Sequence, residues 1–333
     1  MGALLILGSF AACSSAPPPA TNGPGSGGAA QAAVPGAGSP ATSAEAFEAE
    51  CGSSSRLSRV LEKPLASMGR SPKMAALLDG GFLVAGEREA ASVSQTPPRS
   101  VVVVRLGQEG TVAWEITLVH PAGRLAAKAV AETPDGGFAV LGLTELTREQ
   151  RSFGWLAKLS ADGKILWRMF FEKEIGADLE KGDKLEPRLQ PYAFERLSVS
   201  DKGTFTLQGA AATAEIDNRS WLNGVKTEGV VEPAADGSVA LPPELGLDRV
   251  QATASLLDGG TAVVTAMEAP QLGKSCLRLL VLDSGGKLRA KEPLAAEARP
   301  DDRASIAAVG AYKVAVAFAD VGAMQLVVFE VGR

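Results

Sequence analysis

The chain has 333 residues, of which 46% are hydrophobic, so it is long enough to bury a sizeable core. Its 33 Lys and Arg residues are outnumbered by 38 Asp and Glu residues, which gives a formal net charge of −5. The sequence contains no basic block of the kind that neutralises phosphates, so nucleic acid is excluded as an expected partner.

Twelve mostly apolar residues open the chain and end in Phe10-Ala11-Ala12 before Cys13. This run is too short to cross a bilayer as a helix and predicts a signal peptide over residues 1–12. Phe10 to Cys13 resembles the lipobox of bacterial lipoproteins. The resemblance implies cleavage before Cys13, lipidation of that residue, and an exported protein anchored to a bacterial membrane, with the outer membrane favoured. An ordinary cleaved signal peptide is the alternative.

Residues 13–52 are predicted to form a flexible tether before a folded domain over 53–333. Residues 14–44 carry no charge and consist almost entirely of Ala, Pro, Gly, Ser and Thr, a composition that cannot bury enough apolar surface to order itself. If Cys13 is lipidated, Cys51 and Cys276 remain as an even pair in an oxidising compartment. They can form a disulfide, or they can remain free buried thiols.

A four-part spacing of Asp, Gly, an aliphatic residue and a second Gly recurs along the rest of the chain. The Gly-to-Gly gaps are 29, 26, 26 and 26 residues, so each copy predicts one supersecondary unit of a repeat protein. The copies are Asp79/Gly81/Leu106/Gly110, Asp135/Gly137/Leu159/Gly163, Asp201/Gly203/Val225/Gly229 and Asp258/Gly260/Leu282/Gly286.

The second copy shows what each unit contains. Strands are expected at 126–133, 138–144, 153–160 and 164–171, and two of the turns between them contain Asp-Gly, a strong hairpin signal. Each unit is therefore a four-stranded antiparallel meander. Strand runs such as 101–106 and 277–282 are apolar with little alternation, as in strands covered on both faces. Radially stacked sheets provide that cover, so the fold class predicted is an all-β propeller.

A fifth unit over 303–331 ends after three strands. The segment 56–65 reads as a strand without a unit of its own, and we expect it to complete the last blade and close the ring of five blades.

The run from Asp135 to Gly142, followed by the run from Trp155 to Trp167, resembles the repeat of bacterial secreted propellers in the quinoprotein-like group, which has PQQ-like repeats. That group includes the lipoprotein scaffold of outer-membrane assembly. The resemblance implies that Trp114 and Trp167 pack between blades. Enzymes of the group hold a quinone and a metal with dedicated ligands, and no complete ligand set is present here. Neither a cofactor nor a metal is therefore predicted.

Two possible chemical sites are set aside at this stage. His120 is the only histidine and has no evident partners for a metal cluster or a catalytic triad, so no catalytic residue is predicted. Asp178, Glu180, Asp183 and Glu186 lack the spacing of a Ca²⁺ loop and alternate with lysines, which indicates a solvated loop.

Two features favour binding. In a meander of this kind the variable loops share the end opposite the Asp-Gly turns, which predicts a binding face for a protein or an envelope polymer. An Arg stands near the start of each innermost strand, and five converging guanidinium groups would bind carboxylates or phosphates. These residues are Arg70, Arg124, Arg196, Arg249 and Arg303. Local pairing of each Arg with Asp is the alternative.

These observations predict a monomeric, exported, membrane-tethered and non-enzymatic propeller that acts as a binding module or scaffold in the cell envelope. The alternative is a quinoprotein-like enzyme, or a binder of small anions at the channel mouth.

Overall fold

The computed structural model describes residues 44–52, 57–89, 99–120, 123–146, 151–171, 194–209, 213–217, 222–226, 248–269, 272, 274–295, 303–320 and 323–331. The predicted signal peptide, Cys13 and the tether as far as residue 43 lie outside these residues. So do the acidic loop residues 178–186 and most of the variable loops.

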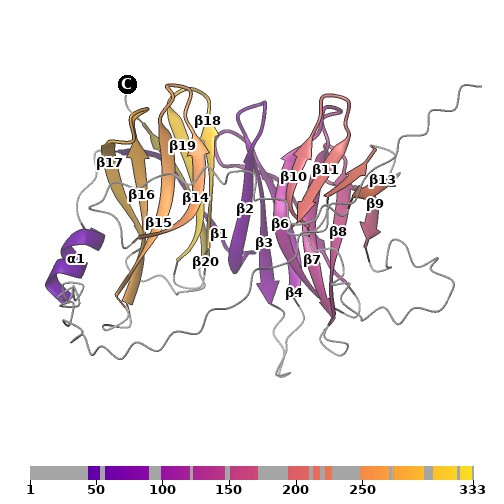
Figure 1. The fold of residues 1–333 in the computed structure, drawn as a ribbon, viewed down its shortest axis with the longest axis horizontal. Helices are drawn as coiled ribbons and strands as arrows, with labels where there is room; N and C mark the ends of the chain where they lie inside the picture. Colours follow the sequence, from indigo (N-terminus) through magenta and orange to yellow (C-terminus); the bar gives the residue numbers. More distant parts are fainter. Residues whose placement is uncertain are drawn as a thin grey trace, which may run out of the picture. The chain divides into compact units, whose positions relative to one another are not determined.

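In the described part of the chain, twenty strands form five four-stranded antiparallel sheets, and the protein is a five-bladed β-propeller as predicted (Figure 1). The first sheet contains β2 (Arg70–Ala76), β3 (Phe82–Glu89), β4 (Arg99–Leu106) and β5 (Val112–Leu118). The second contains β6 (Arg124–Glu132), β7 (Phe138–Leu146), β8 (Arg151–Leu159) and β9 (Ile165–Phe170). The third contains β10 (Phe194–Val199), β11 (Phe205–Gly209), β12 (Thr213–Ile216) and β13 (Leu222–Lys226). The fourth contains β14 (Asp248–Ser255), β15 (Thr261–Ala269), β16 (Lys274–Leu282) and β17 (Leu288–Ala295).

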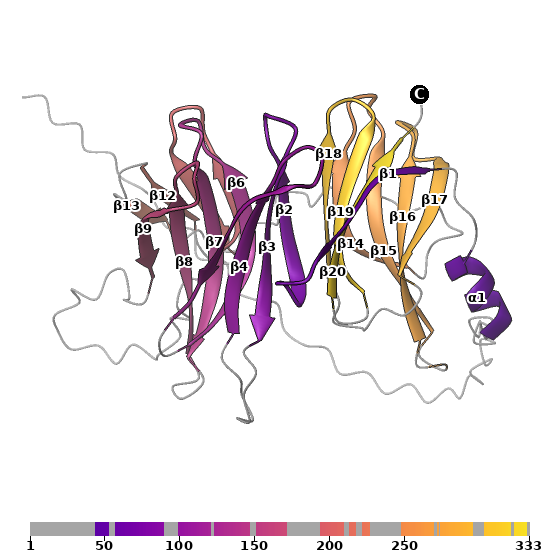
Figure 2. The same ribbon diagram turned by 180° about the vertical axis from the view of Figure 1, so that it is seen from behind.

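The fifth sheet joins the two ends of the domain. It contains β18 (Ala304–Val309), β19 (Lys313–Asp320) and β20 (Ala323–Glu330), with β1 (Ser58–Leu65) paired antiparallel to β20 (Figure 2). The prediction that an N-terminal strand completes the last blade is confirmed. This pairing covers the edge that β20 would otherwise expose.

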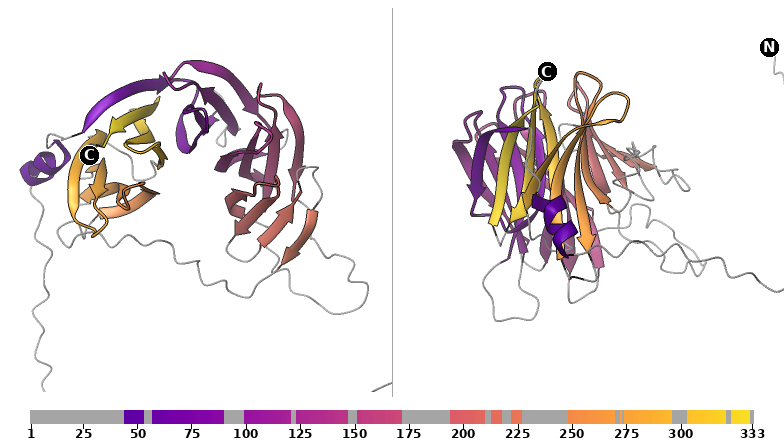
Figure 3. Two further views of the ribbon diagram at one scale, coloured as in Figure 1. Left: turned by 90° about the horizontal axis from the view of Figure 1, so that it is seen from above. Right: turned by 90° about the vertical axis from the view of Figure 1, so that its left-hand side faces the viewer.

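The innermost strands of neighbouring blades pack against one another in the order β14, β18, β2, β6 and β10 (Figure 3). Among the described residues, β10 and β14 are not in comparably close contact. Close packing between innermost strands therefore covers four of the five junctions of the predicted ring.

The recurring spacing is explained by the turn that joins the first two strands of a blade. The Asp135 carboxylate accepts a hydrogen bond from the backbone N–H of Gly137 at 3.2 Å. A Cβ on Gly137 would lie closer than 3.0 Å to the carbonyl oxygen of Leu159, a separation that real Cβ atoms essentially never show. Between them, Gly136 has φ +76°, which favours glycine. Asp, Gly and the aliphatic residue meet at one turn in this way in the first, second and fourth copies.

A basic side chain completes this turn in three blades. The Lys158 ammonium is only 1% exposed and lies 2.6 Å from Asp135, while Asp79 pairs with Arg105 and Asp258 pairs with Arg289. The same carboxylates bind the turn amides, at 2.9 Å for Gly81 and 3.0 Å for Gly260. Asp79, Asp135 and Asp258 are therefore structural residues.

The third copy is offset by one residue from the others. Gly203 has φ +81° and donates to the carbonyl of Ser200, just as Gly80 has φ +80° and donates to Leu77. Gly203 therefore occupies the place of the first turn Gly, and Lys202, rather than Asp201, stands where the other copies have Asp. The sequence alignment of this copy was wrong because its turn has a single Gly.

Both repeat tryptophans contact the following blade. The Trp114 ring lies 5.6 Å from Phe138, and its Nε1–H donates to the carbonyl of Ala161 at 2.9 Å. Trp167 lies 5.8 Å from Phe205 of the third blade. Each Trp thus joins its own sheet to the next one.

A helix, α1 (Ala44–Gly52), lies within the range predicted as tether and packs on the fourth blade (Figure 1). Phe47 is 2% exposed against Ala269 and Cys276, and a disulfide joins Cys51 to Cys276 with their Cα atoms 6.1 Å apart. The folded unit therefore begins before residue 53. The tether prediction ran too far because one apolar face in nine residues is a weak signal beside a long uncharged segment.

Candidate functional site

Four of the five innermost strands carry a break in their pairing with the second strand of the same sheet. The register shifts between Arg70 and Lys73 in β2, Ala127 and Ala129 in β6, Phe194 and Arg196 in β10, and Val250 and Ala252 in β14. A β-bulge of this kind bends the strand and redirects the side chain of the extra residue. The residues within the breaks include Ser71, Lys128, Glu195 and Gln251. In β18 the pairing is regular.

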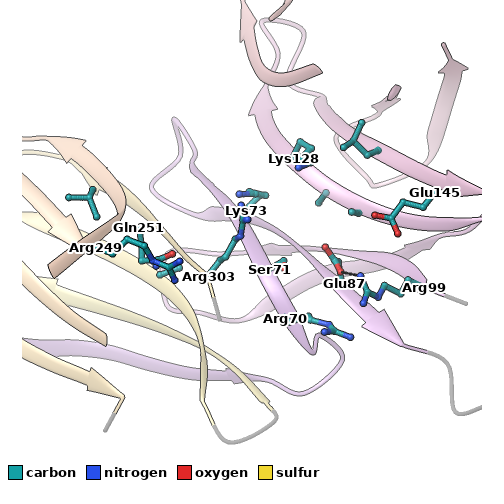
Figure 4. A pocket seen from close by; sticks show the side chains of 15 residues that line it. Arg70, Ser71, Lys73, Glu87, Arg99, Lys128, Glu145, Arg249, Gln251 and Arg303 are labelled. Atoms are coloured by element: carbon teal, nitrogen blue, oxygen red, sulfur yellow. Dashed lines mark hydrogen bonds and ion pairs between the residues drawn. The ribbon is translucent and has the colours of Figure 1, made fainter. Parts of the chain in front are cut away.

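A cavity of about 580 Å³ lies beside three of these breaks. Its walls come from β2, β6, β14 and the start of β18, together with β3, β4 and β7 (Figure 4). Ser71, Lys128 and Gln251 from the bulges all line it. Among the described residues, the charged members of the lining are six cations, Arg70, Lys73, Arg99, Lys128, Arg249 and Arg303, and two carboxylates, Glu87 and Glu145.

The structure brings together three of the five arginines that the sequence singled out. Arg70, Arg249 and Arg303 line the cavity. Arg124 lies next to it and pairs with Glu89 at 3.5 Å, and Arg196 is exposed on β10 and not among the lining residues. The five arginines therefore do not all line one cavity.

Ion pairs within the protein neutralise one side of the cavity. Arg99 lies 3.3 Å from Glu87 and 3.1 Å from Glu89, and Arg70 also pairs with Glu89. Burial raises the pKa of the Glu87 carboxyl above its ordinary 4.5, although Arg99 and Arg70 act in the opposite direction. The free-energy cost of burying the ionised Glu87 carboxylate thus exceeds the stabilisation that Arg99 and Arg70 provide.

The cations on the other side of the cavity are Lys73, Lys128 and Arg303. Lys73 takes part in no hydrogen bond or ion pair with the described residues. Burial lowers the pKa of the Lys73 ammonium below its ordinary 10.5, and the charges of Arg303 and Lys128 lower it further, although Glu195 and Glu87 act in the opposite direction. Lys128 lies 3.7 Å from Glu195, an exposed residue outside the lining.

Sequence reasoning missed Lys73 and Lys128. Each lies in the innermost strand, three or four residues after one of the predicted arginines, and this recurrence is visible in the sequence. What the sequence does not show is the bulge that follows each Arg, which decides whether such a Lys points into the cavity or away from it.

The raised pKa of Glu87 gives a prediction for stability. The folded state binds the Glu87 proton more readily than the unfolded state, so the contribution of this residue is favourable below about pH 4.5 and is lost as the pH rises through the raised pKa. We therefore expect Glu87→Gln to gain stability relative to the wild type over that pH range. Melting temperatures of the two proteins from pH 4 upward test this, and a relative gain by the wild type would contradict it.

Of the remaining candidates from the sequence, the structure describes His120, which is not among the lining residues of the cavity. The His120 ring packs edge-on against Phe153 at 6.1 Å and Phe170 at 5.1 Å, which explains its place in the loop after β5 without chemistry. Asp178, Glu180, Asp183 and Glu186 lie outside the described residues. Within those residues, no cluster of metal-ligating side chains is found, and no helix is both long and apolar enough to cross a membrane.

No family model matches the chain, and no curated protein matches it. Solved structures do resemble it. A protein of unknown function from Bacteroides caccae is 17% identical, with a TM-score of 0.37 over 68% of this chain and 82% of that one. The GH43_1 enzyme from Xanthomonas citri is 12% identical, with a TM-score of 0.41 over 80% and 89%. CoXyl43, a GH43 beta-xylosidase/alpha-arabinofuranosidase from a compost microbial metagenome, is 10% identical, with a TM-score of 0.42 over 82% and 94%.

These comparisons correct the functional prediction from the sequence. The propellers that the chain resembles include glycoside hydrolases, which contradicts the prediction of a non-enzymatic scaffold and with it the exclusion of an enzyme. The predicted membrane tether is not tested by these comparisons. The prediction failed because it treated the absence of one family's ligand set as evidence against catalysis in general. At these identities the similarity concerns the fold alone and carries no substrate to this chain.

Proposed function

We propose that the cavity binds a small anionic ligand through Lys73, Lys128 and Arg303. The observation that supports this is a half-buried ammonium, Lys73, without a partner among the described residues, beside two further cations on the wall of one cavity. Buried charges are ordinarily paired because desolvation of an isolated ion is costly. An anion from solution would supply the missing charge.

The balance of charge in the wall supports the same site. Six cations face two carboxylates, and Glu87 is already committed to Arg99. Arg249 is also paired, with Glu268 at 3.4 Å. Lys128 of β6 pairs with Glu195 at 3.7 Å, so the surplus positive charge is carried by Lys73 of β2 and by Arg303 next to the start of β18. These three elements are neighbours in the packing order of the innermost strands, so their side chains can act on one ligand.

Lys73 is expected to contribute to ligand binding and not to the stability of the fold. Because the folded state lowers the Lys73 pKa, it binds this proton less readily than the unfolded state, and the charged Lys73 is a net cost at neutral pH. That cost disappears only as the pH rises from the lowered pKa toward 10.5. If Lys73 instead served packing, replacing it would lower the melting temperature.

The test is titration of the full chain with citrate and with inorganic phosphate by calorimetry at low and at physiological salt. Lys73→Met keeps most of the side-chain volume, and we expect it to weaken binding at least about tenfold while the melting temperature stays equal or rises, because one of three converging charges is removed. The matched control is Lys164→Met, since Lys164 is 79% exposed and pairs only with Asp162.

Wild-type affinity in Lys73→Met would overturn the proposal, as would a wild-type protein that binds neither anion. A fall in melting temperature without loss of binding would assign Lys73 a structural role instead.

The compartment is part of the same proposal. The disulfide between Cys51 and Cys276 supports a place of action that is oxidising, because such bonds persist outside the reducing cytosol. The lipid anchor at Cys13 stays a prediction, since that residue lies outside the described part of the chain.

A further inference from the structure

The cavity has a second wall whose chemistry differs from the cationic side. Glu87 from β3, Glu145 from β7 and Ser71 from β2 supply oxygens on this side, whereas Gln251 from β14 lies beside Arg249 and Arg303 (Figure 4). An ionised carboxylate accepts hydrogen bonds and repels other anions. A ligand that fills the cavity must therefore also carry hydrogen-bond donors, because one of its ends meets acceptors.

Glu145 is the clearest acceptor on this wall. It is exposed to the cavity side of β7, and no hydrogen bond or ion pair with the described residues involves it. Glu87 keeps one oxygen, Oε2, against Arg99. These two carboxylates come from the second strands of neighbouring blades, next to the innermost strands that carry Lys73 and Lys128.

Ser71 joins the two walls. It is the one non-glycine residue with positive φ, +52°, in the described part of the chain, and its side chain hydrogen-bonds to Glu87. A non-glycine residue in this region of φ costs free energy, and such strain is concentrated at functional sites. The same break in register leaves Ser71 outside the ladder between β2 and β3.

The lining also limits what the neutral part of the ligand can be. The apolar members of the wall are Ala126, Ala127, Leu143, Val250 and Ala304, and no described lining residue is aromatic. Flat rings and nucleobases are recognised largely by stacking on aromatic side chains, which this wall lacks. Hydroxyl groups match it better, because each can donate to a carboxylate and accept from the amide group of Gln251.

We propose that the ligand is a polyhydroxylated carboxylate of the sugar-acid class. Its carboxylate binds to Lys73, Lys128 and Arg303, and its hydroxyl groups donate to Glu145 and Glu87. This inference rests on the proposed function and adds the part of the ligand that the acceptor wall selects. The cavity volume of about 580 Å³ accommodates a single sugar acid or the acidic end of a short oligosaccharide.

The experiment compares galacturonate with two probes that each lack one half of its chemistry. Hexanoate has the carboxylate without the hydroxyls, and galactose has the hydroxyls without the carboxylate. For the full-length wild type we expect galacturonate to bind at least about tenfold more tightly than either probe. A galacturonate trimer distinguishes the source of the ligand, because tighter binding of the trimer indicates an acidic polysaccharide and equal binding indicates a free sugar acid.

Two variants test which residues bind the hydroxyl groups of the ligand and which bind its carboxylate. Glu145→Ala should reduce the preference for galacturonate over hexanoate to less than about threefold, while inorganic phosphate binds as well as before or better because a repelling charge is gone. The matched control is Glu215→Ala, at an exposed position on β12 outside the cavity lining. Lys73→Met should weaken galacturonate and phosphate together.

The outcomes separate this inference from the proposed function. Equal binding of galacturonate and hexanoate, with both still dependent on Lys73, would overturn the sugar-acid class and leave the anion site intact. An unchanged galacturonate preference in Glu145→Ala would also overturn it. Loss of all dependence on Lys73 would overturn both.

Discussion

Replacing Gly142 by Ala is expected to destabilise the propeller by on the order of 3 kcal/mol, which lowers the melting temperature of a domain of this size by roughly 6–10 °C. Gly142 lies in β7 between two obstacles. A Cβ there would fall closer than 3.0 Å both to the carbonyl oxygen of Ala126 and to the ring of Trp155. Trp155 is fully buried, and the Ala126 carbonyl is backbone, so neither can move aside cheaply.

The same substitution at Gly52 is the matched control, since a Cβ on that residue of α1 meets nothing within 4 Å. Thermal unfolding of both variants followed by circular dichroism makes the comparison. A melting temperature for Gly142→Ala within about 1 °C of the wild type would show that the second blade repacks freely, contrary to the close approach seen here. Because Ala126 also lines the cavity, we expect this variant to bind anions less well even where it remains folded.

Removing the disulfide is expected to cost about 2–4 kcal/mol. The Cys51–Cys276 bond closes a loop of 225 residues and holds α1 on β16. Without it, α1 is held by the burial of Phe47 and by the ion pair of Lys274 with Glu48 at 3.0 Å, which is solvent-exposed and contributes little. The helix has only nine residues and is too short to be stable alone.

The measurement is the melting temperature of the wild type with and without dithiothreitol, together with the double variant Cys51→Ala, Cys276→Ala. Reductant should lower the wild-type value by several degrees and leave the double variant unchanged. Limited proteolysis should then cut within residues 44–52 in the reduced protein and not in the oxidised one. An unchanged melting temperature on reduction would show that the bond adds nothing to the native state.

The blade architecture could be predicted from the sequence because it depends on local chemistry. Asp135, Gly137 and Leu159 meet at one turn, and the equivalent three residues meet in each regular blade. Their spacing in the sequence is therefore fixed. The closing strand could also be found by counting, because β20 needs a partner and Ser58–Leu65 is a strand that no other unit uses.

The candidate site could be predicted only in part. The arginines were found by their spacing, yet Arg124 and Arg196 do not line the cavity and Lys73 and Lys128 do. One residue inserted at a bulge reverses which side chains face inward along a strand, and a sequence does not mark where the insertion occurs. Arg70 and Arg99 pair within their own blade, whereas Lys128 pairs with Glu195 of the next blade, and the sequence does not show which of these pairs form.

The sequence by itself determined the repeat, the number of blades and the strand that completes the last one, because hairpin turns are specified by residues a few positions apart. Only the tertiary structure decided where the folded unit begins, that Cys51 meets Cys276, and which cations line one cavity. Those properties depend on contacts between residues tens to hundreds of positions apart, and such contacts are set by the packing of whole sheets against one another rather than by any local pattern.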